Sequence, residues 1–322
     1  MTVIDLKPVG INSSLDLSNN HTEYLLEHVP TEQEDGVLRT PESKNRCIIQ
    51  FKNSFIEGGY GIIHDSHRTI DKYTHECYVK YSKNTKNNLL NEALLQYVSY
   101  LTLKKYKIQY MIAEVYDIYK RTDNTVLFSM EKKYGKSMIE FILESNKPEL
   151  DFINCLIQMC IILIILKKEV YLDHRDLRYT NALVIKKPTK IHFVFDKEYT
   201  IKTDYHVCLL DFGFSCIGED KPTIKTSDDI YKLDKICMKP GRDMFLFVSS
   251  FFFIKQFREK LNPNFIHIMD KWFIHNDKNY SKTILKSEEL AYMITYNDSF
   301  EFNFFIPEVF LSYLYDLRNC YM

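Results

Sequence analysis

The hydrophobic pattern of the chain changes twice and divides it into three parts. Residues 1–45 are polar, contain three prolines and show little periodicity, so we expect a tail with one short helix near residues 21–29. From Cys47 onward, short alternating or apolar runs follow one another, which is typical of strands. After Gly135 apolar residues recur with helical spacing. The pattern predicts a small β-rich part and a larger helical part, divided near residue 134.

In the β-rich part the pattern predicts five strands and one helix. The strands are expected at residues 47–56, 60–65, 76–81, 112–120 and 124–132. Between the third and fourth of them, residues 88–104 place apolar side chains on one helical face.

The larger part begins with two helical segments, at 137–145 and 151–168. A loop at 171–181 follows, then strand-like pieces at 182–187, 190–196, 199–203 and 205–211, then a region rich in Phe, Leu and Ile with helical spacing. The most apolar run, at 152–166, has 15 residues and includes Asn154 and Gln158. That is shorter than a bilayer requires, so we expect a buried helix and no membrane span.

The amino-acid composition is that of a folded protein without a strongly basic surface. The 322 residues are 45% hydrophobic and 26% charged, which is typical of a chain with a folded core. The net charge is -1, so the chain has no strong nucleic-acid footprint. The eight cysteines form no C-x-x-C pair and the N-terminus carries no secretory signal pattern, so we expect reduced thiols and a cytoplasmic or nuclear protein.

Two features of the β-rich part suggest phosphate chemistry. Gly58, Gly59 and Gly61 lie between two predicted strands, where backbone N–H groups could approach phosphate oxygens. Taken alone, this run also fits an ordinary β-turn or bulge. Lys80 lies on a strand and Glu92 follows on the helix, so the two could form a buried pair facing an anion. The alternative is two solvated surface charges.

Two further segments carry acids in the larger part. In the loop at 171–181, Asp176 could accept a proton and Asn181 could ligate a cation, since they lie five residues apart in irregular structure. Asp211 ends an apolar strand and is followed by Phe212 and Gly213, so it could hold Mg²⁺ against phosphate oxygens. The alternative is a pair of capping or turn aspartates.

Together these segments resemble the signature set of the eukaryotic protein-kinase family, which combines a Gly-rich loop, a strand lysine, a helix glutamate, an H-R-D-x-x-x-x-N loop and D-F-G. The resemblance covers about residues 47–320. It implies an α+β, two-lobed protein-kinase-like fold, with a polar tail at 1–45, a small β-rich N-lobe at 46–134 and a larger α-rich C-lobe at 135–322. It also implies ATP and Mg²⁺ as cofactors and a protein as substrate.

Carried over residue by residue, the resemblance makes Asp176 the catalytic base, Lys80 the contact of the α- and β-phosphates, and Arg178 a positive charge near the γ-phosphate. It makes Asn181 and Asp211 the Mg²⁺ ligands. The nucleotide contacts are expected from the Gly-rich loop, the lysine–glutamate pair, the gatekeeper and the hinge: Gly58, Gly59, Tyr60, Gly61, Ile63, Lys80, Glu92, Met130, Glu131 and Lys133.

The sequence also departs from the family pattern. Ile56 stands where the first glycine of the loop is usual, and the interval from Lys80 to Glu92 is short, as in casein-kinase-1 and vaccinia-related kinases. No A-P-E motif follows D-F-G, and the long interval from Asn181 to Asp211 suggests an inserted hairpin, as in haspin-like kinases. Asp243 resembles the aspartate that supports the catalytic loop, although it also fits a helix N-terminal acid.

These features favour an ATP- and Mg²⁺-dependent kinase acting on Ser/Thr of a protein, with tyrosine specificity left open because H-R-D-L-R occurs in some tyrosine kinases. One alternative is a pseudokinase that serves as an interaction scaffold. The other is a small-molecule kinase of the same fold. The Tyr-, Phe-, Ile-, Asn- and Lys-rich composition resembles that of kinases of large DNA viruses, which would place the protein in the host cell or virion.

Overall fold

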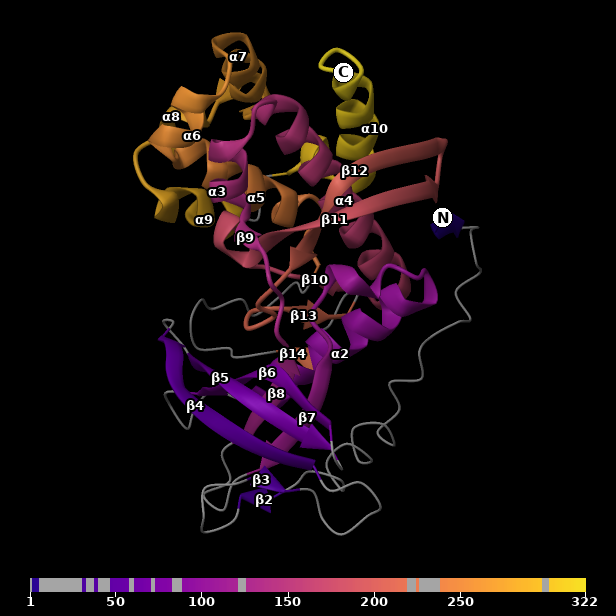
Figure 1. The fold of residues 1–322 in the computed structure, drawn as a ribbon. Helices are drawn as coiled ribbons and strands as arrows, with labels where there is room; N and C mark the ends of the chain where they lie inside the picture. The colour runs from indigo at the N-terminus through magenta and orange to yellow at the C-terminus, as the bar shows by residue number, and fades with distance from the viewer. Residues whose placement is uncertain are drawn as a thin grey trace.

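The protein is a mixed α and β molecule. The computed structural model describes residues 2–5, 31–32, 38–39, 47–57, 61–70, 73–82, 89–120, 126–218, 224–225, 238–296 and 301–322. Strands of the first part gather at one end of the molecule and most helices of the last part at the other (Figure 1). The short helix expected near residues 21–29 lies outside the described residues.

The first part contains the five expected strands and the expected helix. The strands pair in an antiparallel order, which is β4 (Cys47–Glu57), β5 (Gly61–Ile70), β6 (Tyr73–Ser82), β8 (Val126–Glu131) and β7 (Val115–Lys120). Helix α2 (Leu89–Lys105) packs Leu89, Ala93 and Leu94 against Ile118 and Phe128.

Three short strands occur inside the predicted tail, where the hydrophobic pattern shows little periodicity. β2 (Thr31–Glu32) and β3 (Leu38–Arg39) join the sheet of the first part and close it into a barrel, because β2 pairs with β7. β1 (Thr2–Asp5) pairs in parallel with a strand of the larger part. β1 pairs with a strand far away in the sequence, and β2 and β3 have only two residues each, which is too short to show a periodic pattern.

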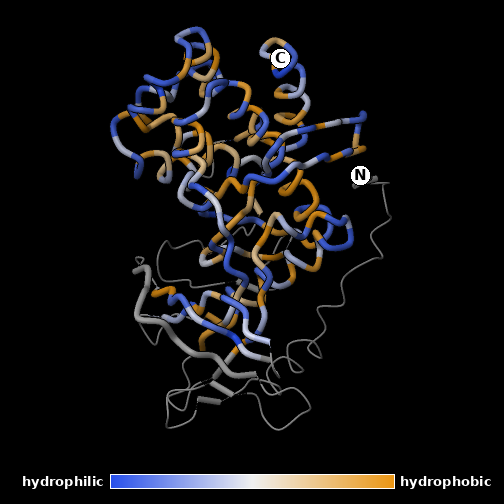
Figure 2. The backbone as a smooth tube through the Cα atoms, in the orientation of Figure 1, coloured by the Kyte–Doolittle hydropathy of each residue, from blue (hydrophilic) through white to orange (hydrophobic). Residues whose placement is uncertain are grey.

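Helix α4 (Pro148–Val170) is the central helix of the larger part. It has 23 residues and extends beyond the predicted segment 151–168 at both ends, and Tyr171 ends it in a left-handed conformation with φ of 51°. By length and composition it could cross a membrane, so the length argument from the sequence was wrong. The burial of the helix argues against a membrane span, because 83% of its most apolar window lies inside the protein. Figure 2 shows the hydrophobic residues concentrated in the interior part of the tube where α4 runs. In the described part of the chain, no clear membrane span follows.

The predicted hairpin is present and is longer than expected. The four strand-like pieces form two strands, β11 (Ala182–Val194) and β12 (Glu198–Leu209), with a bulge between Lys186 and Thr189. Pro188 lies in this bulge, where a residue without an N–H group disturbs no ladder bond. β11 also pairs with β1 and with β9 (Lys136–Ser137). Strand β11 therefore pairs with three strands, β1, β9 and β12.

The remaining helices lie at the end of the molecule away from the first sheet (Figure 1), and they contribute buried residues to the core that contains α4. They are α3 (Met138–Glu144), α5 (Arg242–Phe253), α6 (Lys255–Lys260), α7 (Pro263–Trp272), α8 (Ser281–Ile284), α9 (Glu288–Tyr296) and α10 (Pro307–Arg318). Short strands β10 (Leu172–Asp173), β13 (Cys216–Ile217) and β14 (Ile224–Lys225) pair with one another, as do β15 (Ile274–His275) and β16 (Lys278–Asn279). An aromatic cluster around Phe152, Phe251 and Phe257 fills the space between α4, α5 and α6.

The cysteines only partly match the expectation of eight reduced thiols. Cys77, Cys155, Cys160 and Cys208 are buried free thiols and Cys320 is an exposed one. Burial raises the pKa of the Cys208 thiol to about 12, which makes it a poor nucleophile. Cys216 is disulfide-bonded in the structure, so the prediction was wrong at this position.

The buried His206 on β12 predicts a pH-dependent stability. Burial, followed by the charges of Lys133 and Lys187, lowers its pKa to about 4 from 6.5, and its side chain packs against the Tyr110 ring. Between about pH 4 and pH 6.5, the unfolded chain therefore binds a proton at this imidazole, whereas the folded protein does not. The free energy of unfolding should be unaffected above about pH 6.5 and fall by up to about 3 kcal/mol as the pH drops toward 4.

Urea denaturation across this pH range checks the prediction. His206→Phe should flatten the pH dependence because it removes the titrating group and keeps an aromatic ring against Tyr110. His267→Phe, at an exposed position on α7, is the matched control and should leave the slope as in the wild type. Equal slopes in His206→Phe and the wild type would contradict the assignment.

Candidate active site

Lys80 joins three elements at the centre of the site. It lies on β6 beside the buried Val79 and is itself only 8% exposed. Its Nζ lies 2.5 Å from Glu92 Oε1 on α2 and 3.0 Å from Asp211 Oδ1, which follows β12. The structure thus brings these three predicted residues together, although 131 positions separate Lys80 from Asp211.

The charges around Lys80 are strongly coupled. Burial would lower the pKa of Lys80, but the carboxylates of Glu92 and Asp211 raise it above its ordinary value, so the ammonium stays charged. Burial raises the pKa of Glu92 to about 7 even though Lys80 opposes the shift. For Asp211, burial acts upward and is outweighed by Lys80, so its pKa falls. Asp211 is therefore the firmly ionised partner, whereas Glu92 titrates near neutral pH.

Two glycines allow this close arrangement. A Cβ on Gly61 would lie 3.1 Å from the Tyr81 carbonyl oxygen and 3.3 Å from Lys80 Cε. A Cβ on Gly213 would lie 3.0 Å from Asp211 Oδ1. A side chain at either position would contact Lys80 or Asp211 and displace the atoms of the ion pairs. Of the other predicted loop residues, Ile63 pairs with Lys80 across β5 and β6, while Gly58, Gly59 and Tyr60 lie outside the described residues.

The loop after β10 is anchored on the first turn of α5. The Asp243 carboxylate accepts hydrogen bonds from the backbone N–H groups of His174 and Arg175, each at 2.7 Å. This is the supporting contact that the sequence analysis expected of Asp243. Arg175 has a positive φ of 67°, and the neighbouring Asp173 forms an ion pair with Arg242. The hydrogen bonds to Asp243 and the ion pair of Asp173 with Arg242 together hold the loop in one conformation.

Asp176 lies in this loop and is surrounded by polar partners. Asn181 Nδ2 donates to the Asp176 backbone carbonyl at 2.7 Å and to Oδ2 at 3.2 Å. Arg178 Nε lies 3.2 Å from Oδ1, and the Tyr292 hydroxyl donates to the same oxygen. Burial raises the pKa of Asp176, while Arg178 and the Tyr292 hydroxyl oppose the shift. Such a carboxylate is suited to accept a proton.

Asp211 occupies a strained backbone position. Its φ is 59°, which costs a residue with a Cβ on the order of 1–3 kcal/mol. Gly213 N donates to Oδ1 at 3.2 Å, and the buried Phe212 ring packs against His174. The Asp211 side chain remains 43% exposed. Strain of this kind collects at functional sites, and here it aims a carboxylate outward.

Asn181 and Asp211 offer oxygen atoms of the kind that Mg²⁺ prefers. Asn181 Nδ2 is engaged by Asp176, while the amide oxygen accepts one long hydrogen bond, from Thr180 Oγ1 at 3.4 Å, and has a second lone pair for a ligand. A backbone bond from Leu210 N to the Asn181 carbonyl, 2.9 Å long, holds the Asp211 and Asn181 segments together. Among the described residues no group of three or more His, Cys, Asp or Glu side chains could hold a metal. One carboxylate and one amide suit Mg²⁺, which takes its other ligands from phosphates and water.

The predicted gatekeeper and hinge lie where β8 ends. Met130 Sδ lies 3.6 Å from Gln96 Nε2 of α2, so its side chain reaches the helix that carries Glu92. Glu131 N donates to the Glu114 carbonyl at 2.8 Å, and its carboxylate pairs with Lys133 at 2.7 Å. These three residues therefore form a connected segment beside the strand of Lys80.

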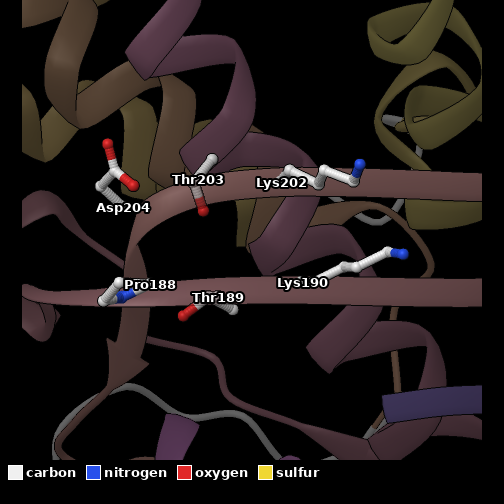
Figure 3. A pocket seen from close by; sticks show the side chains of 6 residues that line it. All are labelled: Pro188, Thr189, Lys190, Lys202, Thr203 and Asp204. Carbon is white, nitrogen blue, oxygen red and sulfur yellow. The ribbon is translucent and has the colours of Figure 1, made fainter. Parts of the chain in front are cut away.

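A hollow of about 370 Å³ lies elsewhere, in the middle of the hairpin next to its bulge (Figure 3). Its lining consists of Pro188, Thr189, Lys190, Lys202, Thr203 and Asp204. It contains none of the predicted site residues and has no buried charge. The candidate site is therefore defined by the buried ion pairs and the anchored loop.

Tyr292 and Glu288 of α9 belong to the same site but were not predicted. Glu288 Oε1 lies 3.6 Å from Arg178 Nη1, and Tyr292 is 8% exposed against Asp176. Burial, then the charge of Asp176, raises the pKa of Tyr292, so its hydroxyl keeps its proton. No motif marks a residue that contacts the loop from 116 positions away.

Comparison with known proteins gives one partial relationship. No family model matches the chain. The chain is similar to "Probable kinase 098L" of Invertebrate iridescent virus 3, with 26% identity over 117 residues. The match covers 35% of this chain and 22% of the viral protein. The chain thus spans about a fifth of the length of that relative, and the similarity indicates a kinase-like relationship.

Proposed function

We propose that the protein is an ATP- and Mg²⁺-dependent protein kinase that phosphorylates Ser/Thr of a protein substrate. The proposal includes a two-lobed kinase fold, with an N-lobe at 46–134 and a C-lobe at 135–322. The observation that supports it best is the meeting of Lys80 with both Glu92 and Asp211. A purely structural ion pair would not require a half-exposed, strained Asp211 beside it.

Each residue has a physical role in this proposal. Lys80 binds the α- and β-phosphates and is oriented by Glu92. Asp211 and Asn181 hold Mg²⁺, which neutralises charge on the phosphates when it is bound. Asp176 orients the acceptor hydroxyl and takes its proton, while Arg178 places positive charge beside it. The chemistry consists of positioning and charge stabilisation.

Labelled ATP tests the proposal directly. The full chain is incubated with γ-labelled ATP, Mg²⁺, a panel of generic proteins and a set of small alcohols and aminoglycosides. We expect label in an added protein substrate, recovered there as phosphoserine or phosphothreonine, and nucleotide-induced thermal stabilisation that requires Mg²⁺. Stabilisation without any transfer would identify a scaffold instead. Label restricted to small molecules would identify a small-molecule kinase.

A further inference from the structure

Helix α9 covers the loop that carries Asp176. The Tyr292 hydroxyl donates a hydrogen bond to Asp176 Oδ1, and Glu288 of the same helix approaches Arg178. The Arg178 guanidinium lies 5.8 Å from the centroid of the Tyr292 ring. Both loop side chains that the proposed function assigns to the transferred phosphate and its acceptor are therefore engaged by α9.

The Tyr292 hydroxyl lies where the hydroxyl of a phosphate acceptor is expected, within hydrogen-bond distance of Asp176. A general base must lie within hydrogen-bond reach of the hydroxyl whose proton it removes. Tyr292 supplies such a hydroxyl to the carboxylate that is proposed to act as the base. The ring is buried and fixed between Asp176 and Arg178, so the hydroxyl is held in place and no diffusion step is needed.

We propose that Tyr292 is an internal phosphate acceptor, phosphorylated by the site of its own chain. The inference rests on the proposed function. A bond forms between Tyr292 Oη and the γ-phosphorus of ATP as the bond from that phosphorus to the β-bridging oxygen breaks. The Tyr292 proton passes to Asp176, and the products are phosphotyrosine, ADP and one proton.

Phosphorylation changes the charge at the contact. A phosphotyrosine carries about -1.5 to -2 charges at neutral pH, which repel Asp176 at hydrogen-bond distance. Helix α9 has nine residues, too few to be stable without packing, so loss of this contact destabilises its position. Arg178 lies close enough to pair with the new phosphate. The reaction thus uncovers Asp176 for an external hydroxyl.

Mass spectrometry of the full chain with Mg²⁺ and ATP tests the assignment. We expect one phosphate on Tyr292, added at a first-order rate that does not change with protein concentration. Tyr292→Phe and Asp176→Asn should lack it. Tyr313→Phe is the matched control, because the Tyr313 hydroxyl accepts a hydrogen bond from Trp272, away from the loop. This variant should be labelled like the wild type.

Amide hydrogen exchange without nucleotide provides a second readout. Tyr292→Phe should exchange about 10- to 100-fold faster across residues 288–296, because it loses one hydrogen bond to a charged group, whereas Tyr313→Phe should not. An unmodified Tyr292 in protein that phosphorylates an external substrate would overturn the inference and leave the proposed function intact. A labelling rate that rises with protein concentration would also overturn it. Failure to transfer phosphate to any acceptor would overturn the proposed function itself.

Discussion

Asp176→Asn should lower the rate of phosphate transfer by about 10² to 10⁴, because an amide cannot accept the acceptor proton. The fold should persist, since an asparagine side chain has nearly the same shape and its oxygen can still accept from Asn181. Nucleotide binding should also persist, because Lys80 and Asp211 are unchanged. Initial rates with labelled ATP and a protein substrate, combined with thermal denaturation, measure both effects.

A matched substitution separates the loss of the base from a general effect of charge. Asp204→Asn makes the same chemical change at an exposed position of the hairpin, so its transfer rate should equal that of the wild type. Wild-type turnover in Asp176→Asn would remove Asp176 from the role of base. A large loss of thermal stability in that variant would mean that Asp176 serves the fold instead.

Local pattern was sufficient for the elements that carry the central charges. Period-two alternation placed Lys80 on the same face of β6 as Tyr78, and helical spacing located α2, whose Leu94 packs against the sheet. Asp243 was identified through the family resemblance of the segment that opens the apolar helix α5. In each case the information lies within a few residues of the side chain concerned.

Features that depend on distant partners were missed. β1 exists as a strand because β11 supplies its hydrogen bonds, and Tyr292 reaches Asp176 only through the packing of α9. The length of α4 was underestimated because tertiary packing and a left-handed terminal residue, not hydropathy alone, determine where it ends. Sequence spacing carries no record of such contacts without a structure.

Lys80→Met should remove nucleotide-induced stabilisation and lower the free energy of unfolding by about 3 kcal/mol, because it leaves Glu92 and Asp211 without their common cation. Methionine keeps the unbranched apolar part of the side chain, so packing changes little. The loss in free energy of unfolding should lie at the lower end of the range of about 3–5 kcal/mol that is typical when one partner of a buried ion pair is removed. Asp211 is 43% exposed and can be solvated, and Glu92 can take up a proton.

The loss caused by Lys80→Met should depend on pH, with a sign fixed by Glu92. In the wild type burial raises the pKa of Glu92 to about 7, and removal of the Lys80 charge must raise it further. A raised pKa of a carboxyl destabilises the folded protein as the pH rises, since the unfolded chain releases the proton first. The difference in free energy of unfolding between wild type and Lys80→Met should therefore be larger at about pH 8 than at about pH 6.

Urea denaturation at both pH values measures this difference. Lys255→Met is the control, because the Lys255 side chain is 77% exposed, and this variant should differ little from the wild type at either pH. A pH-independent loss would mean that Glu92 stays ionised without Lys80, contrary to the burial that surrounds it.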